Sequence, residues 1–256
     1  MFWTCGVNGL HQHARARTLR HRFSLEAGLV WPSAIPDSSG PSRLKSRIHP
    51  SRELLVGYAT GTLPLGPSLT LAVHLECCGA CRHVVLRLEE VEGRLLASTP
   101  GVALQPDALQ RALKQIDTPP AFSGHVKGID AAVEECSLPR MISEIGLSPA
   151  VHLSADTWVA HLDAPRFGGW RTYVLCAPAL AAVPAHGHFG DELIAVLEGS
   201  FHDSREFGPG DFVENRAGFV HEMQIASAGR LVALISSHGA IDWRPRDRAL
   251  GALLDI

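Results

Sequence analysis

Apolar residues recur at helical spacing over about residues 50–118, in four runs separated by Pro and Gly. Apolar positions three or four residues apart line one face of a helix, and Ser, Pro and Gly are typical where helices begin or end. We therefore expect four helices. The apolar positions of the first helix are Leu54, Leu55 and Tyr58, and those of the second are Leu69, Ala72, Val73 and Leu75. The second helix is expected to end near Cys81. The apolar positions of the third helix are Val84, Val85, Leu88, Val91 and Leu95, and those of the fourth are Leu109, Leu113 and Ile116.

From about residue 139 the pattern changes to short β-branched and aromatic runs separated by turn residues, which indicates an antiparallel barrel or jelly roll. The predicted fold class is therefore α + β with two domains. A small four-helix domain spans residues 45–118, an antiparallel β-barrel spans residues 139–256, and a Pro- and Gly-rich linker over residues 119–138 joins them. A helical unit of about seventy residues has a marginal core, so a bound metal commonly supports it.

Residues 1–44 carry many Arg and His, a Pro- and Ser-rich stretch and no sustained apolar period. We expect this leader to be disordered. Two alternatives stay open. The leader could be a basic arm that binds DNA, or it could be mis-annotated and not translated, because bacterial genes can start on codons other than that of Met.

The charge is uneven along the chain. Residues 1–48 hold seven Lys or Arg and two Asp or Glu, which leaves sixteen basic and twenty-four acidic residues beyond them, a net charge of −8. This balance argues against direct nucleic-acid binding. No apolar run of roughly eighteen residues and no secretory signal is visible, so we expect no membrane segment. Three of the six cysteines crowd at Cys77, Cys78 and Cys81. That crowding suits metal binding in a reducing compartment, and we expect a cytoplasmic protein.

The second predicted helix carries the first candidate site. His74, Cys78 and Cys81 are spaced i, i+4, i+7, so we expect all three side chains on one face of that helix. A structural zinc site needs four ligands, and His49 at the start of the first helix completes a His₂Cys₂ set. The alternatives are a redox pair or two small core residues. Cys77 lies off that face, and we assign it as a core or spare thiol.

Two stretches resemble the zinc-binding anti-sigma domain of the ChrR family, from His49 to Leu63 (HPSRELLVGYATGTL) and from Ala72 to Arg82 (AVHLECCGACR). The resemblance implies that His49, His74, Cys78 and Cys81 bind zinc, and it favours Cys78 over Cys77. It also implies a four-helix unit that binds an extracytoplasmic-function (ECF) sigma factor as a 1:1 heterodimer. Apolar helix faces, such as that of Leu109, Leu113 and Ile116, would lie in a groove of the partner, or else form ordinary core.

The β region holds a second motif. The stretch from Pro184 to Glu192 (PAHGHFGDE) and the stretch from Phe207 to Asp211 (FGPGD), followed by His221, resemble the two motifs of a cupin. His186 and His188 point to one side of a strand, Glu192 is expected on the paired strand and His221 on a neighbouring hairpin. Three imidazoles and a carboxylate accept zinc, manganese, iron or nickel, and the resemblance favours zinc. Gly199, Gly208 and Gly210 are expected in turns.

Other candidate residues have weaker support. Asp191 and Glu222 adjoin metal ligands and could orient an imidazole, although solvated surface acids fit the pattern equally well. Cys176 fits the core, and Cys136 is a candidate reactive thiol near the linker.

Two functions of different classes fit these motifs. In the first, the protein is an anti-sigma factor without enzymatic activity, and its cupin domain receives an oxidative signal, singlet oxygen or an organic peroxide in terms of the family, that releases the sigma factor. In the second, it is a metal-dependent cupin dioxygenase or isomerase with an appended zinc module, which needs an open coordination position and an acid or base beyond the ligands. A DNA-reading zinc finger is the third reading, and the acidic balance opposes it.

Overall fold

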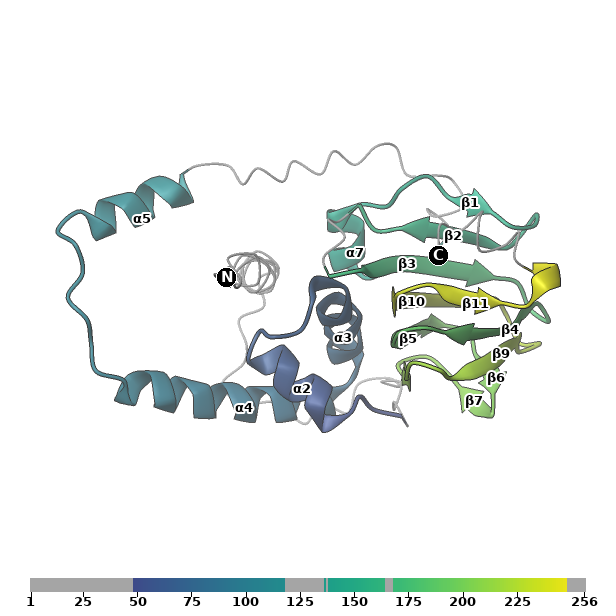
Figure 1. The fold of residues 1–256 in the computed structure, drawn as a ribbon, viewed down its shortest axis with the longest axis horizontal. Coiled ribbons are helices and arrows are strands. Elements are labelled where there is room, and N and C mark those ends of the chain that lie inside the picture. Colours follow the sequence, from purple (N-terminus) through teal and green to yellow (C-terminus); the bar gives the residue numbers. More distant parts are fainter. Residues whose placement is uncertain (1–47, 118–135, 137, 164–167, 248–256) are drawn as a thin grey trace, which may run out of the picture.

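Helices open the described part of the chain, and a sandwich of two antiparallel sheets follows (Figure 1). The computed structural model describes residues 48–117, 136, 138–163 and 168–247. The leader expected over residues 1–44 and nearly all of the linker expected over residues 119–138 lie outside the described residues, and the domain boundaries stay a prediction. The helices are α2 (Arg52–Ala59), α3 (Leu65–Cys77), α4 (Gly79–Ser98), α5 (Ala108–Ile116), α7 (Arg140–Ile145) and the short 3-10 helix η1 (Pro245–Asp247).

The sandwich consists of a six-stranded sheet of order β1-β2-β3-β10-β5-β8 and a five-stranded sheet of order β11-β4-β9-β6-β7. All pairings within them are antiparallel, which confirms the predicted β-domain behind a helical region. The strands are β1 (Val151–His152), β2 (Trp158–His161), β3 (Trp170–Ala177), β4 (Ala182–His188), β5 (Glu192–Glu198), β6 (Phe201–Asp203), β7 (Arg205–Phe207), β8 (Phe212–Asn215), β9 (Val220–Ile225), β10 (Leu231–His238) and β11 (Ile241–Trp243).

The six-stranded sheet buries side chains on both of its faces. One face contributes Ile194 and Ile235 to the apolar interior of the sandwich. The other face contributes Val174 and Leu234 to a cluster that also contains Leu71 of α3. The helical region therefore shares one apolar core with the sheet, instead of forming a core of its own.

Helix α3 approaches the sheet closely at its first turn. A side-chain carbon added to Gly66 would lie 2.5 Å from Thr172 Oγ1 of β3, so only a glycine fits there without a shift. One turn later, the fully buried Thr70 hydroxyl lies 2.8 Å from Ser236 Oγ of β10, which in turn lies 2.8 Å from Thr172 Oγ1. These hydroxyl contacts satisfy polar groups that would otherwise be buried without partners.

The predicted second and third helices meet at Cys78, where the chain turns sharply. α3 ends at Cys77, α4 begins at Gly79, and the two helices are bent by 118°. Cys78 has extended backbone, and its Sγ accepts a hydrogen bond from the Cys81 backbone N at 3.5 Å, which caps α4. The prediction that His74, Cys78 and Cys81 project from one face of a single helix is therefore wrong.

The apolar faces of α4 and α5 lie largely in solvent. Val85 of α4 is buried, whereas Val91, Leu95 and Leu96 of the same helix are exposed, and α5 has no buried residue. Figure 1 shows α4 running away from the sandwich and α5 standing apart from it. Within the described residues, no single helix is long and apolar enough to span a membrane, and the one helix pair that passes the same test, α3 with α4, is sharply bent.

Two helical glycines give a matched test of the contact between α3 and the sheet. Gly66→Ala should lower the free energy of unfolding by about 1–3 kcal/mol, because its new carbon meets the buried Thr172 hydroxyl. Gly93→Ala in α4 should raise it by up to about 1 kcal/mol, because nothing lies within 4 Å of the added carbon and alanine favours a helix. Chemical denaturation of both variants measures the difference, and equal effects would contradict the close approach.

Candidate metal centres

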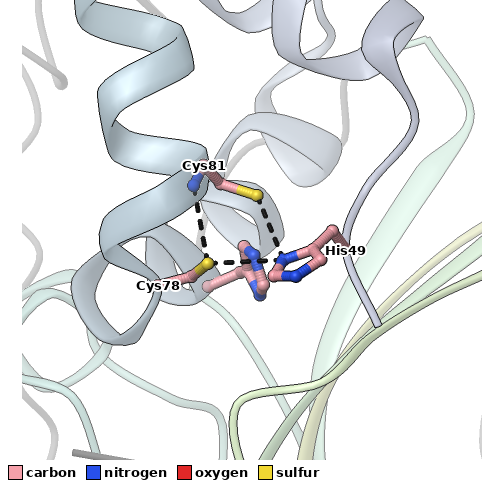
Figure 2. Close-up of side chains that lie close together, drawn as sticks. His49, Cys78 and Cys81 are labelled. Carbon is pink, nitrogen blue, oxygen red and sulfur yellow. Dashed lines mark hydrogen bonds between the residues drawn. The ribbon is translucent and has the colours of Figure 1, made fainter. Parts of the chain in front are cut away.

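The first candidate centre lies at the bend between α3 and α4 (Figure 2). His74 comes from the last turn of α3, Cys78 from the bend itself and Cys81 from the first turn of α4. His49 approaches from the segment that precedes α2. One ligand atom from each of these four residues lies within 4.8 Å of the other three. The structure thus brings together the whole predicted His₂Cys₂ set, although it does so at a bend instead of on one helix face.

The distances within this centre suit tetrahedral zinc. His49 Nδ1 lies 3.4 Å from both Cys78 Sγ and Cys81 Sγ. Ligands at ordinary Zn–N and Zn–S distances in a tetrahedron are separated by about 3.6 Å. Cys77 is exposed and is not part of the cluster, as the sequence predicts for a spare thiol.

His74 is prepared for metal binding by its surroundings. Its Nδ1 donates a hydrogen bond to the Gly210 carbonyl at 2.8 Å, so the lone pair sits on Nε2. That Nε2 is buried and has no hydrogen-bond partner among the described residues, which is the state expected of a metal ligand. Burial lowers the pKa of His74 to about 4, and burial together with Cys78 raises the pKa of the Cys81 thiol to about 12. A bound cation would favour the thiolate form.

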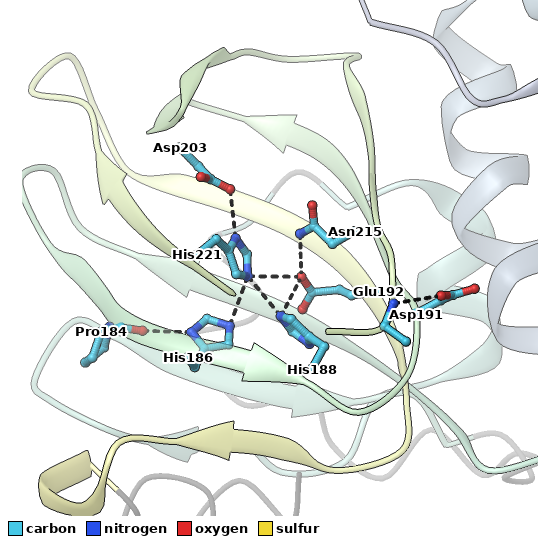
Figure 3. Close-up of polar contacts among 9 residues, drawn as sticks. Pro184, His186, His188, Asp191, Glu192, Asp203, Asn215 and His221 are labelled. Atoms are coloured by element: carbon cyan, nitrogen blue, oxygen red, sulfur yellow. Dashed lines mark hydrogen bonds and ion pairs between the residues drawn. The ribbon is translucent and has the colours of Figure 1, made fainter. Parts of the chain in front are cut away.

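The second candidate centre lies inside the sandwich, between its two sheets (Figure 3). His186 and His188 come from β4, and His221 comes from β9, opposite His186 in the register of the two strands. Glu192 begins β5, which belongs to the other sheet. The prediction that Glu192 lies on the strand paired with the histidines is therefore wrong, because the turn from β4 to β5 crosses from one sheet to the other.

The four side chains converge on one point. His221 Nε2 lies 3.0 Å from His188 Nε2, 3.1 Å from His186 Nε2 and 3.4 Å from Glu192 Oε2. All four residues are buried. At ordinary metal–nitrogen distances of about 2.1 Å, two nitrogens that bind one ion lie about 3.0–3.4 Å apart. All four side chains can therefore reach a single ion.

Three groups outside this ligand set hold it in position. The Pro184 carbonyl accepts a hydrogen bond from His186 Nδ1 at 2.7 Å, and Asp203 Oδ2 accepts one from His221 Nδ1 at 2.8 Å. Both bonds leave the Nε2 lone pairs free to bind a metal. Asn215 Nδ2 donates to Glu192 Oε2 at 3.0 Å. We did not predict these roles from the sequence.

Neither acid that we considered for such a role contacts an imidazole in the structure. Asp191 accepts from the Ala217 backbone N, and Glu222 is exposed and bonds Gln224. Asp203 takes the role instead. In β6 an exposed residue separates a buried Phe from this buried Asp, so the side chain of Asp203 lies on the interior side of the strand. No motif in the sequence marks this role.

The charges in this centre are consistent with cation binding. Burial alone would raise the pKa of Glu192, but the His221 hydrogen bond and the nearby imidazoles lower it to about 2. Burial lowers the pKa of His186 to about 4. Burial lowers the pKa of His221, but its contacts with Glu192 and Asp203 outweigh this effect and raise the pKa, so a divalent metal at this centre would displace a proton from His221.

The family model described as the ChrR cupin-like domain matches residues 144–242. Anti-sigma-E factor ChrR from Cereibacter sphaeroides is 33% identical over 172 aligned residues, and the match covers 64% of this chain and 77% of the relative. The chain belongs to the ChrR family.

A solved structure from the same family extends the match. In the crystal structure of Rhodobacter sphaeroides SigE in complex with the anti-sigma ChrR, the matched chain is 29% identical with a TM-score of 0.61, and the match covers 75% of this chain and 100% of that one. An RmlC-like cupin protein from Ralstonia eutropha is less similar, with 20% identity, a TM-score of 0.34, and 41% of this chain and 70% of that one covered. The match to the SigE–ChrR structure covers more of this chain than the sandwich alone, so it extends into the helical region.

Two further cysteines in the described part of the chain lie in the apolar core. Cys136 and Cys176 are both buried and belong to the cluster beneath α3. Burial and the neighbouring Cys136 raise the pKa of the Cys176 thiol to about 12. The prediction that Cys176 is a core residue is confirmed, and the burial of Cys136 does not favour it as a reactive thiol.

The contact between Asp203 and His221 predicts a loss of metal affinity. Asp203→Asn should weaken metal binding at the sandwich centre by about 10- to 100-fold, because the amide no longer stabilises the His221 imidazole as the carboxylate does. Competition with a chromophoric chelator measures the affinity. Glu222→Gln, next to His221 in sequence but exposed, should leave the affinity unchanged. Equal losses in both variants would exclude a specific role for Asp203.

Proposed function

We propose that this protein is an anti-sigma factor that sequesters an ECF sigma factor through its helical region. The observation that carries the proposal is the match to the whole chain of the solved family member, whose structure contains SigE and the anti-sigma ChrR. The 33% identity to Anti-sigma-E factor ChrR supports it. A sigma factor acts on RNA polymerase, so such a complex would form in the cytoplasm.

The exposed apolar faces of α4 and α5 supply a surface for that partner. Val91, Leu95 and Leu96 of α4 are more than half exposed, and so are Leu109 and Ile116 of α5. Contiguous exposed apolar surface is unfavourable in water and marks an interaction site. A helix that lays such a face into a groove of a partner would bury it. We therefore propose a 1:1 complex in which α4 and α5 contact the sigma factor.

We further propose that both centres bind metal. The centre formed by His49, His74, Cys78 and Cys81 suits zinc, because its thiolate and imidazole donors make a closed tetrahedral site. The centre formed by His186, His188, Glu192 and His221 accepts zinc, manganese, iron or nickel, because three imidazoles and a carboxylate suit all of these ions. Elemental analysis of the intact chain identifies the ions.

We propose the sandwich centre as the sensor of the oxidative signal. An oxidant of the singlet-oxygen or organic-peroxide type, acting at this centre, would favour a conformation with lower affinity for the sigma factor. The alternative is a cupin enzyme that uses the same centre. Iron or manganese in the sandwich, with no bound sigma factor after co-purification, would favour the enzyme.

Loss of the helical centre should release the sigma factor. Cys78→Ser should raise transcription from the sigma-dependent promoter to the level seen without any anti-sigma factor, because the metal joins α3 to α4 and orders the surface that binds the partner. Cys77→Ser is the matched control, since Cys77 lies outside the centre, and it should still repress. A reporter strain measures both, and full repression by Cys78→Ser would refute the proposal.

Loss of the sandwich centre should have a different effect. His188→Ala should retain repression and lose most of the response to oxidant in the same reporter strain, because the helical surface remains in place. Leu95→Asp, which puts a charge on the exposed face of α4, should do the opposite and lose repression. If His188→Ala released the sigma factor without oxidant, the sandwich would be part of the partner contact instead of the sensor of the signal.

A further inference from the structure

Strand β8 lies between the two candidate centres and presents one face to each of them. The side chains of a strand alternate between its two sides. Phe212 belongs to the apolar cluster shared with α3, whereas Val213 belongs to the interior of the sandwich. The alternation continues with Glu214 on the helical side and Asn215 on the interior side, as their contacts show.

On the helical side, β8 and the turn before it hold the segment that carries His49. The Ile48 backbone N donates to Asp211 Oδ1 at 3.0 Å, and the Phe212 backbone N donates to the Ile48 carbonyl at 3.0 Å. The Ser51 backbone N donates to Glu214 Oε1. His49 is thus fastened to β8 by the residue before it and by a residue two positions after it.

The same turn also holds the second histidine of the helical centre. The Gly210 carbonyl accepts the hydrogen bond from His74 Nδ1, and the Phe212 ring meets the His74 ring edge-on, with centroids 5.5 Å apart. Asp211 is itself held by the Gly208 backbone N, which donates to its Oδ2 at 2.9 Å. Two of the four ligands of the helical centre therefore depend on residues of the sandwich.

On the interior side, β8 holds a ligand of the sandwich centre. Asn215 lies opposite Glu192 in the register of β8 and β5, and its amide donates to the Glu192 carboxylate. Glu214 and Asn215 are adjacent residues, so one peptide unit separates the contact to one centre from the contact to the other. A shift of β8 along or about its axis would change both contacts.

We propose that β8 couples the two centres, so that metal bound at either one raises the affinity of the other. The inference rests on the proposed occupancy of both centres by metal. Glu214 and Asp211 act as positioning residues for the helical centre, and Asn215 acts as one for the sandwich centre. Binding at the sandwich centre fixes Glu192, and through Asn215 it fixes β8 in the position that holds His49 and His74. Because linkage is reciprocal, the same factor applies in both directions.

Cobalt(II) in the intact chain tests the coupling. Only the helical centre has thiolate ligands, so the thiolate-to-cobalt charge-transfer band reports that centre alone. The affinity of the helical centre, measured by chelator competition on this band, should fall about fivefold or more when His188→Ala disables the sandwich centre. Far-UV circular dichroism confirms that the variant is folded. If the variant is not folded, the reciprocal measurement replaces it. Cys81→Ser, which disables the helical centre, must then lower the metal affinity of the sandwich centre by the same factor.

A double-mutant cycle assigns the coupling to β8. In a Glu214→Ala background the effect of His188→Ala should shrink toward no change, because Ser51 loses its acceptor. Glu214→Gln, which keeps an acceptor oxygen, should restore the effect, and Glu222→Ala, at an exposed position of β9 in the other sheet, should not alter it. Two results would overturn the coupling and leave both metal sites in place. One is a metal affinity of the helical centre that does not change in His188→Ala, and the other is an effect of His188→Ala that persists in the Glu214→Ala background. Absence of the thiolate band in the unmodified chain overturns the metal proposal itself.

Discussion

The packing of α3 on the six-stranded sheet is the contact on which the helical centre depends. Gly66 allows the helix axis to come close to β3, and the buried hydroxyls of Thr70 and Ser236 hold it there. About two turns further on, the same helix delivers His74 to the Gly210 carbonyl at the edge of the sandwich. The helical centre is therefore built partly from a helix end and partly from the loop of a β-domain. Without the close approach at Gly66, the imidazole would face solvent or apolar side chains instead of its acceptor.

The two centres differ in the way that their donors are prepared. At the bend after α3, two sulfur atoms and two imidazoles enclose a point from all sides, which suits an ion that stays in place and contributes to folding. Inside the sandwich, carbonyl and carboxylate acceptors set the tautomers of two imidazoles, and the fourth donor is a carboxylate. Thiolate and imidazole donors favour zinc at the first centre, whereas the donors of the second suit several divalent metals.

Much of this arrangement could be predicted from the sequence, because ligand types at short spacing survive errors in the helix bounds. The set of His49, His74, Cys78 and Cys81 was predicted on a wrong local geometry, since i, i+4, i+7 spacing also arises where one helix ends and the next begins. Asp203 could not be assigned in this way, because only the packing of β6 beside β9 brings it to His221, eighteen residues away. The solvent exposure of Leu95 could not be predicted from the sequence either. Apolar periodicity is the same for a helix face that packs in its own chain and for one that meets a partner.

The bend at Cys78 also sets the direction of the longest helix in the described chain. α4 has twenty residues and is about 30 Å long, and it is anchored to the rest of the molecule mainly near its first turns. A rotation of about 10° at such an anchor would displace the far end of the helix sideways by about 5 Å. The candidate ligands Cys78 and Cys81 lie at that bend. A small change in the angle between α3 and α4 would therefore move Leu95 and Leu96 by about the width of a side chain.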